Sequence, residues 1–366
     1  MLFQNNHISY CTNIHAYGTV TELLSALEYS VAKVASKFPS PFAAGLYLSY
    51  RIVEELTDSE EKIKQLKDCL IKHNLYVCSL NCFPYGDFHD CVVKETVYLP
   101  NWGDQRRVEY TCKAGTILDR LLPEGQVGTI STVPIAYRKE LPVTAFDHIR
   151  QTLIHFSKLE HKIVLALEPE PDCYLDDTAS CLTFFARAKS ELSVKLFPYL
   201  GLCFDTCHFS VLFEKPLAAF QKLKAAGINI PKVQISSAIV TECPEKLNSF
   251  AEPTYLHQTA IKLENGQLIR YNDLDKALAK IYFKKAEWRV HFHLPIYLEI
   301  TKEGLGTTNP ELVPFLAFLA SAENLHIEVE TYSLGVIPGT VISAEESTIR
   351  ELQFLLRHLR PTLTIN

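Results

Sequence analysis

Short apolar runs alternate with longer amphipathic stretches along most of the chain. The segments of helical period have apolar residues three and four positions apart, and they include VTELLSALEYSVAKVASKF, DSEEKIKQLKDCLIKH, TAFDHIRQTLIHFSKLE, PLAAFQKLKAAG and NPELVPFLAFLASAEN. Nine runs have the length of strands and end in turn residues: HISYCTNI, AAGLYLSY, LYVCSLNCF, GTISTVP, KIVLALEPEP, YLGLCFDTCH, KVQISSA, WRVHFHLPIYLEI and HIEVETYS. A strand followed by a helix, repeated about eight times, predicts a parallel sheet with helices covering it.

Two architectures satisfy this pattern: a closed eight-stranded barrel and an open doubly wound sheet. The dinucleotide-binding form of the open sheet has a glycine-rich GxGxxG after its first strand, and the first predicted strand has none. The pattern therefore favours an α/β fold of the (β/α)8 TIM-barrel type.

Nine strand-like runs are one more than such a barrel needs. We interpret segment 239–287 as an insertion near the barrel mouth, between the last strands. Asn265 and Gly266 lie between apolar flanks in it and predict a hairpin turn. Either KVQISSA or WRVHFHLP is then the seventh barrel strand, and the pattern leaves both open. We expect residues 1–366 to form a single TIM-barrel domain with this insertion.

Composition narrows the class of protein. The formal net charge is −6 and Lys and Arg are spread along the chain, which makes nucleic acid an unlikely partner by the electrostatic criterion. The 11 cysteines form no CxxC pair and are odd in number, which is typical of reduced thiols. The N-terminus lacks the features of a signal peptide, and no run of about 18 apolar residues occurs. We expect a cytoplasmic protein with no membrane insertion.

Candidate chemistry lies at the ends of the predicted strands. Burying an ionised carboxylate costs several kcal/mol unless a partner compensates it, and the strand ends of a barrel meet at one mouth. Carboxylate oxygens and imidazole nitrogens suit manganese, magnesium, zinc or iron. The strand ends thus predict a divalent metal site built from Glu168 and Glu170, Asp205 with His208, Gln234, His291 and His293, and Glu328 and Glu330.

Each of these residues also has an ordinary structural explanation. A single Glu at a strand end is often a salt-bridge residue, Asp205 is in a position to cap a helix, and HFH at 291–293 could pack in an apolar strand. We interpret His257 and His15 as structural or peripheral residues. What favours a site is the repetition, because four separate strand ends terminate in ligand-type residues. Gln234 is the weakest member, since an amide is a poor metal ligand.

Motifs along nearly the whole chain, from about residue 8 to residue 355, resemble a known family. CTNIH, LNCFPYGDFH, VKETVYLPNW, STVPIAY, LALEPEP, FDTCH, KVQISSA, EPTYLHQ, EWRVHFHLP and EVETY together resemble the EboE-type metabolite traffic proteins of the xylose isomerase-like TIM barrel superfamily. This resemblance implies a barrel whose relatives include sugar epimerases, isomerases and endonuclease IV-like enzymes, many of them metal-dependent. The EboE-type family itself is named for its gene neighbourhood and an inferred part in moving or maturing a metabolite.

The superfamily also implies roles for single residues. In the ketose epimerase branch a Glu, an Asp, a His and a second Glu at the ends of strands five to eight hold the metal. By this resemblance Glu168, Asp205 and Glu330 (or Glu328) match the acids, and His208 matches a substrate-contacting His. Judged by its distance along the chain from Asp205, Gln234 occupies the position of the metal His on the seventh strand. Judged by local sequence, HFH at 291–293 is more similar to that epimerase strand. A Gln in that position would weaken the metal site and put enzymatic activity in doubt.

The leading hypothesis is an isomerase or epimerase acting on a small polar metabolite, such as a sugar or sugar phosphate, through an enediolate. Glu168, Glu330, His208 and Glu170 would be catalytic; the substrate-binding candidates are His291, His293, Arg51 and His257; the metal ligands would be Glu168, Asp205, Gln234 and Glu330. One alternative is a metal-dependent phosphoester hydrolase like endonuclease IV, which the charge of −6 disfavours. Another is a non-catalytic metabolite-binding or traffic protein, which Gln234 favours.

The HFH strand carries a separate prediction. Two residues apart, His291 and His293 face the same side, and we expect at least one of them to reach the pocket of Glu168 and Glu330. The insertion would then fold over the mouth and carry His257 with it. The alternative is that HFH packs in an excursion outside the barrel.

Overall fold

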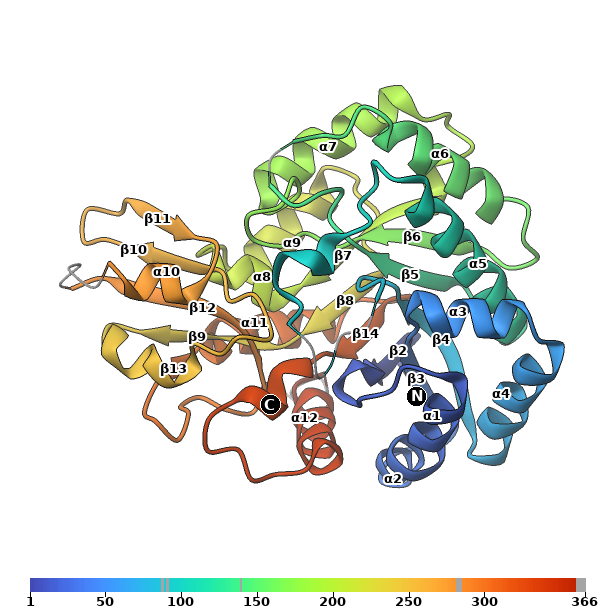
Figure 1. Cartoon of the computed structure of the whole chain (residues 1–366), viewed down its shortest axis with the longest axis horizontal. Coiled ribbons are helices and arrows are strands. Elements are labelled where there is room, and N and C mark those ends of the chain that lie inside the picture. Colours follow the sequence, from blue (N-terminus) through green and yellow to red (C-terminus); the bar gives the residue numbers. More distant parts are fainter. Residues whose placement is uncertain (87–88, 90–91, 139, 281–284, 360–366) are drawn as a thin grey trace, which may run out of the picture.

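Eight parallel strands form the barrel that the sequence predicts (Figure 1). The computed structural model describes residues 1–86, 89, 92–138, 140–280 and 285–359. The nine-stranded sheet has the order β1-β2-β14-β8-β7-β6-β5-β4-β3, in which β1 (Leu2–Phe3) is a short antiparallel addition. The barrel strands are β2 (Asn6–Tyr10), β3 (Phe42–Tyr47), β4 (Leu75–Asn81), β5 (Gly128–Thr132), β6 (Ile163–Leu167), β7 (Leu200–Asp205), β8 (Lys232–Ile235) and β14 (His326–Val329).

A seam between β2 and β3 closes the barrel. Cys11 and Gly45 form a parallel bridge across it, and the Tyr47 N–H donates to Thr12 Oγ1 at 3.0 Å. Gly45 is required here, because a Cβ at this position would lie 1.7 Å from a side-chain oxygen of Glu328. The lack of a side chain at Gly45 on β3 therefore leaves room for the Glu328 carboxylate inside the barrel.

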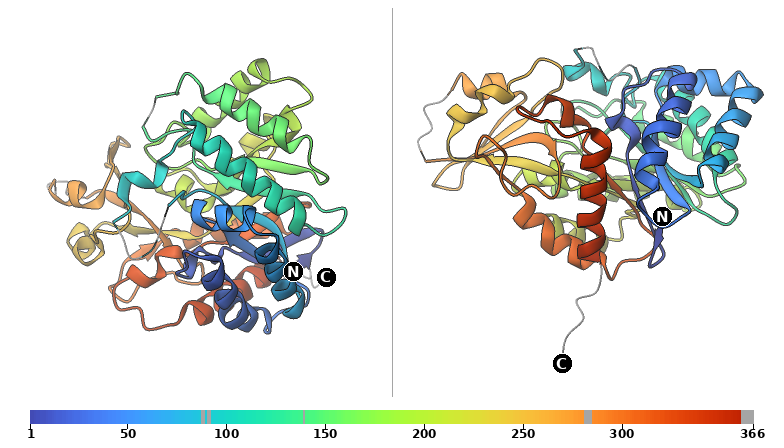
Figure 2. Two further views of the ribbon diagram at one scale, coloured as in Figure 1. Left: turned by 45° about the vertical axis from the view of Figure 1, so that its right-hand side comes forward. Right: turned by 90° about the horizontal axis from the view of Figure 1, so that it is seen from below.

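Helices surround the barrel on its outer face (Figure 2). Their apolar stripes, at three- and four-residue spacing, pack against the strands. The helices of the barrel are α1 (Val20–Ala26), α2 (Ala32–Ala35), α3 (Tyr50–Thr57), α4 (Glu60–Lys72), α5 (Gln105–Leu121), α6 (Ala145–Phe156), α7 (Thr178–Glu191), α8 (Thr206–Val211), α9 (Pro216–Ala225), α11 (Asn309–Leu319) and α12 (Ala344–Leu359).

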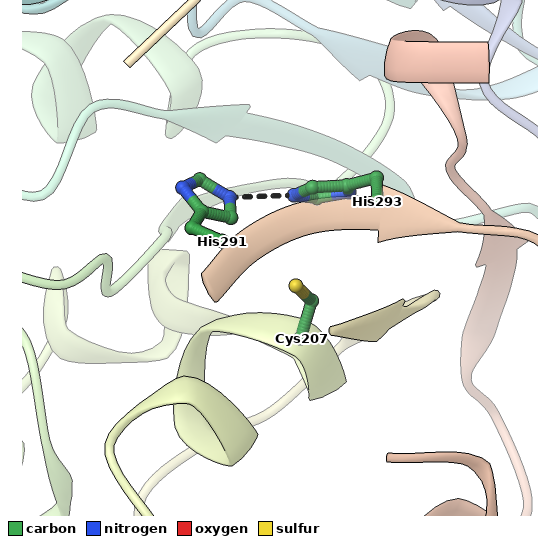
Figure 3. A group of neighbouring side chains, drawn as sticks. All are labelled: Cys207, His291 and His293. Carbon is green, nitrogen blue, oxygen red and sulfur yellow. Dashed lines mark hydrogen bonds between the residues drawn. The ribbon is translucent and has the colours of Figure 1, made fainter. Parts of the chain in front are cut away.

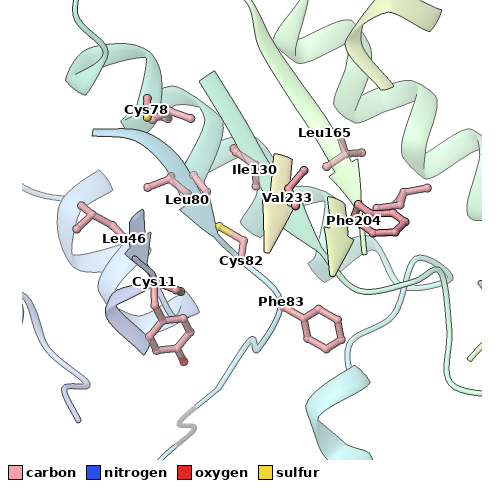
Figure 4. Packing of buried hydrophobic residues seen from close by; sticks show 14 of the residues in the cluster. Cys11, Leu46, Cys78, Leu80, Cys82, Phe83, Ile130, Leu165, Phe204 and Val233 are labelled. Carbon is pink, nitrogen blue, oxygen red and sulfur yellow. The ribbon is translucent and has the colours of Figure 1, made fainter. Parts of the chain in front are cut away.

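The two faces of the barrel strands differ in chemistry. Leu80, Ile130, Leu165, Phe204 and Val233 belong to the apolar cluster between strands and helices (Figure 4). The alternate residues point into the barrel, and there they are largely polar.

An ion pair inside the barrel shows this polar interior. Lys232 Nζ lies 2.7 Å from Glu328 Oε1 and donates to Ser131 Oγ at 3.2 Å. Ser131 is on β5, which is not a neighbour of β8 in the sheet, so this contact crosses the barrel interior. Ser9 Oγ donates to the other oxygen of Glu328 at 3.2 Å.

A second, antiparallel sheet is built from the chain between β8 and α11 (Figure 1, orange). KVQI forms β8 in the barrel, whereas WRVHFHL lies in the second sheet, so the structure assigns KVQISSA as the seventh barrel strand. This sheet runs from residue 237 to residue 307 and extends beyond the predicted segment 239–287 at both ends. Its order is β11-β10-β12-β9-β13, with β9 (Ser237–Thr241), β10 (Thr259–Lys262), β11 (Leu268–Tyr271), β12 (Glu287–Leu294) and β13 (Gly306–Thr307), and α10 (Leu274–Leu278) lies between β11 and β12.

The predicted hairpin is confirmed in this sheet. β10 and β11 pair antiparallel around Asn265 and Gly266, and Gly266 has φ +83°, a conformation that favours glycine. In the described part of the chain, no helix is both long and apolar enough to span a membrane. Each cysteine that the structure describes is a free thiol.

Candidate metal and substrate site

Three carboxylates meet at the carboxyl end of the barrel. Glu168 directly follows β6, Asp205 is the last residue of β7, and Glu330 directly follows β14. One ligand oxygen from each lies within 4.8 Å of the other two, although the side chains are only 3%, 0% and 3% exposed. The prediction that the strands ending at these residues and at Gln234 are adjacent is confirmed by the order β14-β8-β7-β6.

Hydrogen bonds orient one oxygen of Asp205 and one of Glu330. Asp205 caps α8, and its Oδ1 accepts from the backbone N–H groups of Cys207 at 2.7 Å and His208 at 3.1 Å. Glu330 Oε1 accepts from the side-chain amides of Asn13 and Asn81, both at 2.8 Å.

The remaining oxygens are left unpaired. Asp205 Oδ2, Glu330 Oε2 and Glu168 Oε2 are buried and have no hydrogen-bond partner among the described residues. Buried oxygens without donors are costly, and a bound cation would compensate these three carboxylates.

The electrostatics support the same conclusion. Burial raises the pKa of Glu168 well above its usual range, and the charges of Glu330 and Asp205 add to this effect. Burial and the charge of Asp205 raise the pKa of Glu330 to about 8, and burial raises that of Asp205. Three ionised carboxylates this close are stable only with compensating positive charge. The donor set fits a divalent cation, because carboxylate oxygens are the ligands that magnesium and manganese prefer.

Gln234 does not join these carboxylates. It pairs in register with Asp205 and with Glu328, but its Oε1 is turned toward Cys203, whose Sγ donates to it at 2.7 Å. Its Nε2 is buried without a hydrogen-bond partner in the described chain, and the residue does not line the cavity above the carboxylates. The metal-ligand role predicted for Gln234 therefore finds no geometric support.

A cavity with an empty volume of about 490 Å³, partly open to solvent, lies over the carboxylates. Its polar floor and apolar rim suit a small polar molecule. The rim comes from the loop after β4 (Phe83, Pro84, Val93, Lys94, Val97 and Tyr98), from the inserted segment (Tyr255 and Leu256) and from the segment after β14 (Tyr332). The floor comprises Asn13, Asn81, Glu168, Glu170, His208, His293 and Glu330.

Glu170 lines the cavity beside the three carboxylates. Its Oε1 accepts from the Tyr98 hydroxyl at 2.7 Å and from Gln258 Nε2 at 3.0 Å. Burial raises the pKa of Glu170 to about 7, and the two hydrogen bonds limit the increase. One donor comes from the loop after β4 and the other from the insertion, so tertiary contacts hold this acid in place.

Three imidazoles gather next to this group. His291 and His293 stand on the same side of β12, as predicted, with Cys207 of α8 nearby (Figure 3). His293 lines the cavity, and its Nδ1 lies 4.0 Å from Glu330 Oε2. His208 Nε2 lies 4.0 Å from Asp205 Oδ1, and His291 Nδ1 lies 3.6 Å from Glu170 Oε1. The HFH strand is thus outside the barrel sheet but delivers its side chains to the barrel mouth.

Burial also controls the charge of these histidines. It lowers the pKa of His208 to about 3, that of His293 to about 4 and that of His291 well below the usual value. All three rings are neutral at physiological pH, which is the form that binds metals.

Three predicted substrate-binding residues, Arg51, His257 and His291, lie outside the cavity lining, and only His293 of the four belongs to it. Arg51 is on α3 with a side chain that is 64% exposed, and it pairs with Glu55 one helical turn away at 3.6 Å. His257 is buried behind β12, where Nδ1 lies 2.9 Å from the His291 carbonyl and Nε2 lies 2.7 Å from Glu252 Oε1. Tyr255 and Leu256 line the cavity, whereas the ring of His257 stacks on Phe292 of β12.

Several site residues were missed from the sequence. Asn81 ends β4 and Asn13 closely follows β2, so the strand-end criterion would have found both if it had been applied to the first and third strands. Lys94, Tyr98 and Gln258 lie in connecting segments, where no periodic pattern marks them. Only the folded chain shows that they belong to the site.

Comparison with known proteins supports the fold. No family model and no curated protein matches the chain. Solved structures do match over nearly its full length. A xylose isomerase-like TIM barrel protein from Mycobacterium smegmatis in complex with magnesium has a TM-score of 0.57 at 10% identity, covering 97% of this chain and 96% of its own.

Two further structures are similar. IOLI protein with a bound zinc atom has a TM-score of 0.52 at 13% identity, with 96% and 97% coverage of the two chains. The probable 3-DHS dehydratase AsbF from Bacillus anthracis has a TM-score of 0.51 at 11% identity, with 96% and 98% coverage. These likenesses establish a xylose isomerase-like TIM barrel fold for this chain.

Proposed function

We propose that this protein is a metal-dependent isomerase or epimerase-like enzyme acting on a small polyhydroxylated metabolite. The observation that carries the proposal is the group of three buried carboxylates, Glu168, Asp205 and Glu330, which come within ligand distance of one another and each have one oxygen without a hydrogen-bond partner in the described chain. Two of the similar solved structures contain a metal, magnesium in one and zinc in the other, and this supports a metal-dependent function for the shared fold.

The three carboxylates would hold the ion. When bound, a divalent cation would polarise a substrate carbonyl and the neighbouring hydroxyl, which lowers the cost of enediolate charge. Asn13 and Asn81 keep Glu330 oriented, and the first turn of α8 keeps Asp205 oriented. The chain thus holds its ligands in place before the ion arrives.

Glu170 is the proposed proton acceptor and donor at the carbon next to the carbonyl. It lies outside the group of three ligands, and its Oε1 is held by Tyr98 and Gln258, while neither donor contacts Oε2. Proton transfer by a positioned carboxylate contributes about 10²–10⁴-fold to a rate. Glu168 and Glu330 are the other acid–base candidates, and His208 lines the same cavity.

The charges of the cavity favour a neutral substrate over a phosphorylated one. Among the described lining residues the one Lys or Arg is Lys94, and its ammonium is already paired with Asp273 Oδ2 at 2.7 Å. Glu168, Glu170 and Glu330 face the same space and would repel a phosphate. We therefore favour a sugar or cyclic polyol without a phosphate group.

A non-catalytic metabolite-binding or traffic protein is the second candidate. It is favoured by Gln234, because its amide oxygen accepts from Cys203 Sγ and the residue does not line the cavity. The EboE-type motifs are compatible with either function. In this case the same cavity would bind the metabolite without turning it over.

Hydrogen exchange distinguishes the two candidates. The full chain, loaded with Mn²⁺ or Mg²⁺, is incubated in D₂O with a panel of unphosphorylated ketoses and keto-polyols, and deuterium at the carbon next to the carbonyl is followed by NMR. We expect metal-dependent exchange with at least one compound, reduced about 10²-fold or more by Glu170→Gln. Glu299→Gln, an exposed acid of the insertion, is the matched control and should leave the rate unchanged.

Binding of a panel compound by calorimetry without exchange in the metal-loaded protein would overturn the enzymatic proposal and support the non-catalytic one. Exchange that persists at the full rate in Glu170→Gln would remove Glu170 from the reaction.

A further inference from the structure

Three buried histidines at the barrel mouth contact one another through their Nε2 atoms. His293 Nε2 lies 2.9 Å from His291 Nε2, as Figure 3 shows, and 3.3 Å from His208 Nε2. His293 is therefore common to both contacts. A neutral imidazole carries one N–H and one lone pair, so the position of each proton decides which of these contacts are hydrogen bonds.

His208 and His291 each hold their proton on Nδ1. His208 Nδ1 lies 2.7 Å from the Pro169 carbonyl, and His291 Nδ1 lies 2.6 Å from Gln258 Oε1. Carbonyl and amide oxygens only accept hydrogen bonds, so Nδ1 is the donor in both rings. Each of the two rings therefore presents an Nε2 lone pair to His293.

The orientation of the Gln258 amide is set by its other contacts. Its Nε2 donates to the Pro171 carbonyl at 3.2 Å and to Glu170 Oε1 at 3.0 Å. With the amide turned round, its oxygen would face a carbonyl and an ionised carboxylate, neither of which can donate. Oε1 is therefore the atom that faces His291, and Gln258 joins this ring to Glu170.

His293 then donates from Nε2. One N–H between the two lone pairs makes a hydrogen bond of the 2.9 Å contact with His291 and a longer, shared one of the 3.3 Å contact with His208. A proton on Nδ1 of His293 would instead leave three Nε2 lone pairs facing one another in a buried site, which is unfavourable. Nδ1 of His293 is accordingly the atom that accepts.

Two groups compete for that Nδ1 atom of His293. The Ser236 hydroxyl lies 3.1 Å from it and can donate to it, whereas the Glu330 carbonyl lies 3.0 Å from it and can only accept. The hydroxyl thus favours the proton on Nε2, and the carbonyl favours the proton on Nδ1. Ser236 is itself held in place, because its N–H donates to Thr206 Oγ1 at 3.1 Å and its carbonyl accepts from the same hydroxyl at 2.8 Å.

We propose that the Ser236 hydroxyl selects the Nε2–H tautomer of His293 and thereby positions Glu170 for proton transfer. The hydrogen bonds then all run in one direction, from Ser236 through His293, His291 and Gln258 to Glu170. Successive hydrogen bonds of this kind polarise and strengthen one another. This inference rests on the proton-transfer function proposed above for Glu170.

The seventh barrel strand contributes to the site through this serine. Ser236 directly follows β8 and connects it to β9, the part of the second sheet that comes next in the chain. It does not line the cavity, so it acts on the reaction through other residues and not by touching the substrate. We therefore expect Ser236 to affect the rate at saturation and not the binding of the compound.

NMR of the imidazole nitrogens tests the tautomers on the full chain in the presence of Mg²⁺. Couplings between the ring nitrogens and the carbon-bound ring protons show which nitrogen is protonated. We expect Nε2–H for His293 and Nδ1–H for His291. His148 is the reference for Nδ1–H, because its Nδ1 lies 2.9 Å from the Trp102 carbonyl. This measurement needs no variant, and a proton on Nδ1 of His293 would overturn the proposal.

Ser236→Ala tests the connection to Glu170. It should move the His293 proton to Nδ1 and shift the ¹³C resonance of the Glu170 carboxyl group, which is assigned by its loss in Glu170→Gln. Ser236→Thr keeps the hydroxyl and should restore both signals. Ser237→Ala is the matched control, since Ser237 is also buried but its hydroxyl has no hydrogen-bond partner in the described chain. An unchanged Glu170 resonance in folded Ser236→Ala would overturn the proposal.

Kinetics provide a second measurement, with a compound that the exchange experiment identifies. Ser236→Ala should lower the exchange rate at saturation by about 10-fold or more and leave KM unchanged, because a displaced acid transfers the proton less efficiently. A rate equal to that of Ser237→Ala would overturn the positioning role. Exchange with none of the compounds would contradict the proposed function, and the two NMR measurements would still decide whether Ser236 positions Glu170.

Discussion

At the scale of single residues, Asp205 has two tasks that use different oxygens. Oδ1 caps α8 through two backbone N–H groups, and Oδ2 has no hydrogen-bond partner in the described chain, which leaves it available to bind the proposed ion. An asparagine keeps an acceptor for the cap but removes the formal charge.

Asp205→Asn should therefore keep α8 intact and weaken binding of Mn²⁺ by about 10- to 100-fold or more, because an ionic ligand becomes neutral. Titration calorimetry measures the affinity, and circular dichroism checks the fold. An unchanged affinity would place the ion elsewhere.

Lys232 supplies the positive charge that pairs with Glu328 in the polar barrel interior. Burial opposes its charge, but the adjacent carboxylate of Glu328 outweighs this effect and the pKa of the ammonium is raised. Removing one member of a buried ion pair leaves the other charge uncompensated.

We expect Lys232→Met to lower the free energy of unfolding by about 3–5 kcal/mol, and the double variant Lys232→Met, Glu328→Gln to recover part of that loss. Urea unfolding of the metal-free protein measures both. A double variant no more stable than Lys232→Met would show that the pair is not coupled.

At the scale of elements, α12 is attached to the mouth through one acid. Glu351 is buried, and it accepts hydrogen bonds from Thr331 Oγ1 at 3.0 Å and from the Ile296 N–H at 3.2 Å. It thereby connects the helix to the chain just after Glu330 and to the loop after β12. Burial raises the pKa of Glu351 to about 8.

The folded chain therefore holds a proton on Glu351 that the unfolded chain releases near the ordinary pKa of about 4.3. This contribution to stability is fully present below that value and is lost as the pH rises through about 8. The free energy of unfolding of the unmodified chain should fall between roughly pH 5 and pH 9 because of this group. In Glu351→Gln we expect that fall to be smaller by about 2 kcal/mol or more. Urea unfolding across this range tests it, with the exposed Glu346→Gln on the same helix as the control. Parallel pH profiles for the unmodified chain and Glu351→Gln would contradict the assignment.

At the scale of the whole molecule, the site exists only when the barrel is closed and the second sheet is docked. The cavity takes its floor from residues at or just after the ends of barrel strands together with His293 of the insertion, and most of its rim from the loop after β4 and the insertion. These two rim segments contact each other, since the Val93 N–H donates to the Thr254 carbonyl at 2.9 Å. Closure at the seam of β2 and β3 depends on Gly45.

Gly45→Ala should destabilise the protein by about 1–3 kcal/mol or more, because the added methyl group would overlap the Glu328 carboxylate. Gly335→Ala, where an added Cβ meets nothing within 4 Å, should be close to neutral. Thermal and urea unfolding compare the two. Equal stability of both variants would show that the interior around Glu328 adapts without cost.

The sequence by itself determined the strand–helix alternation, the hairpin at Asn265–Gly266 and the acids at the mouth. These features are local: periodicity assigns strands and helices, and parallel strands bring their carboxyl ends to the same edge. This is why Glu168, Asp205 and Glu330 could be predicted together from three separate segments.

Only the tertiary structure decided which strand-like run enters the barrel and which side chains complete the site. Gln234 looked like a ligand by its position, but its oxygen turns to Cys203. Glu170 is held by Tyr98 and Gln258, and β12 brings His291 and His293 to the mouth from outside the barrel. The physical reason is that these outcomes depend on contacts through space between segments far apart in the chain. Side-chain direction and hydrogen-bond partners at such contacts leave no periodic signal in the sequence.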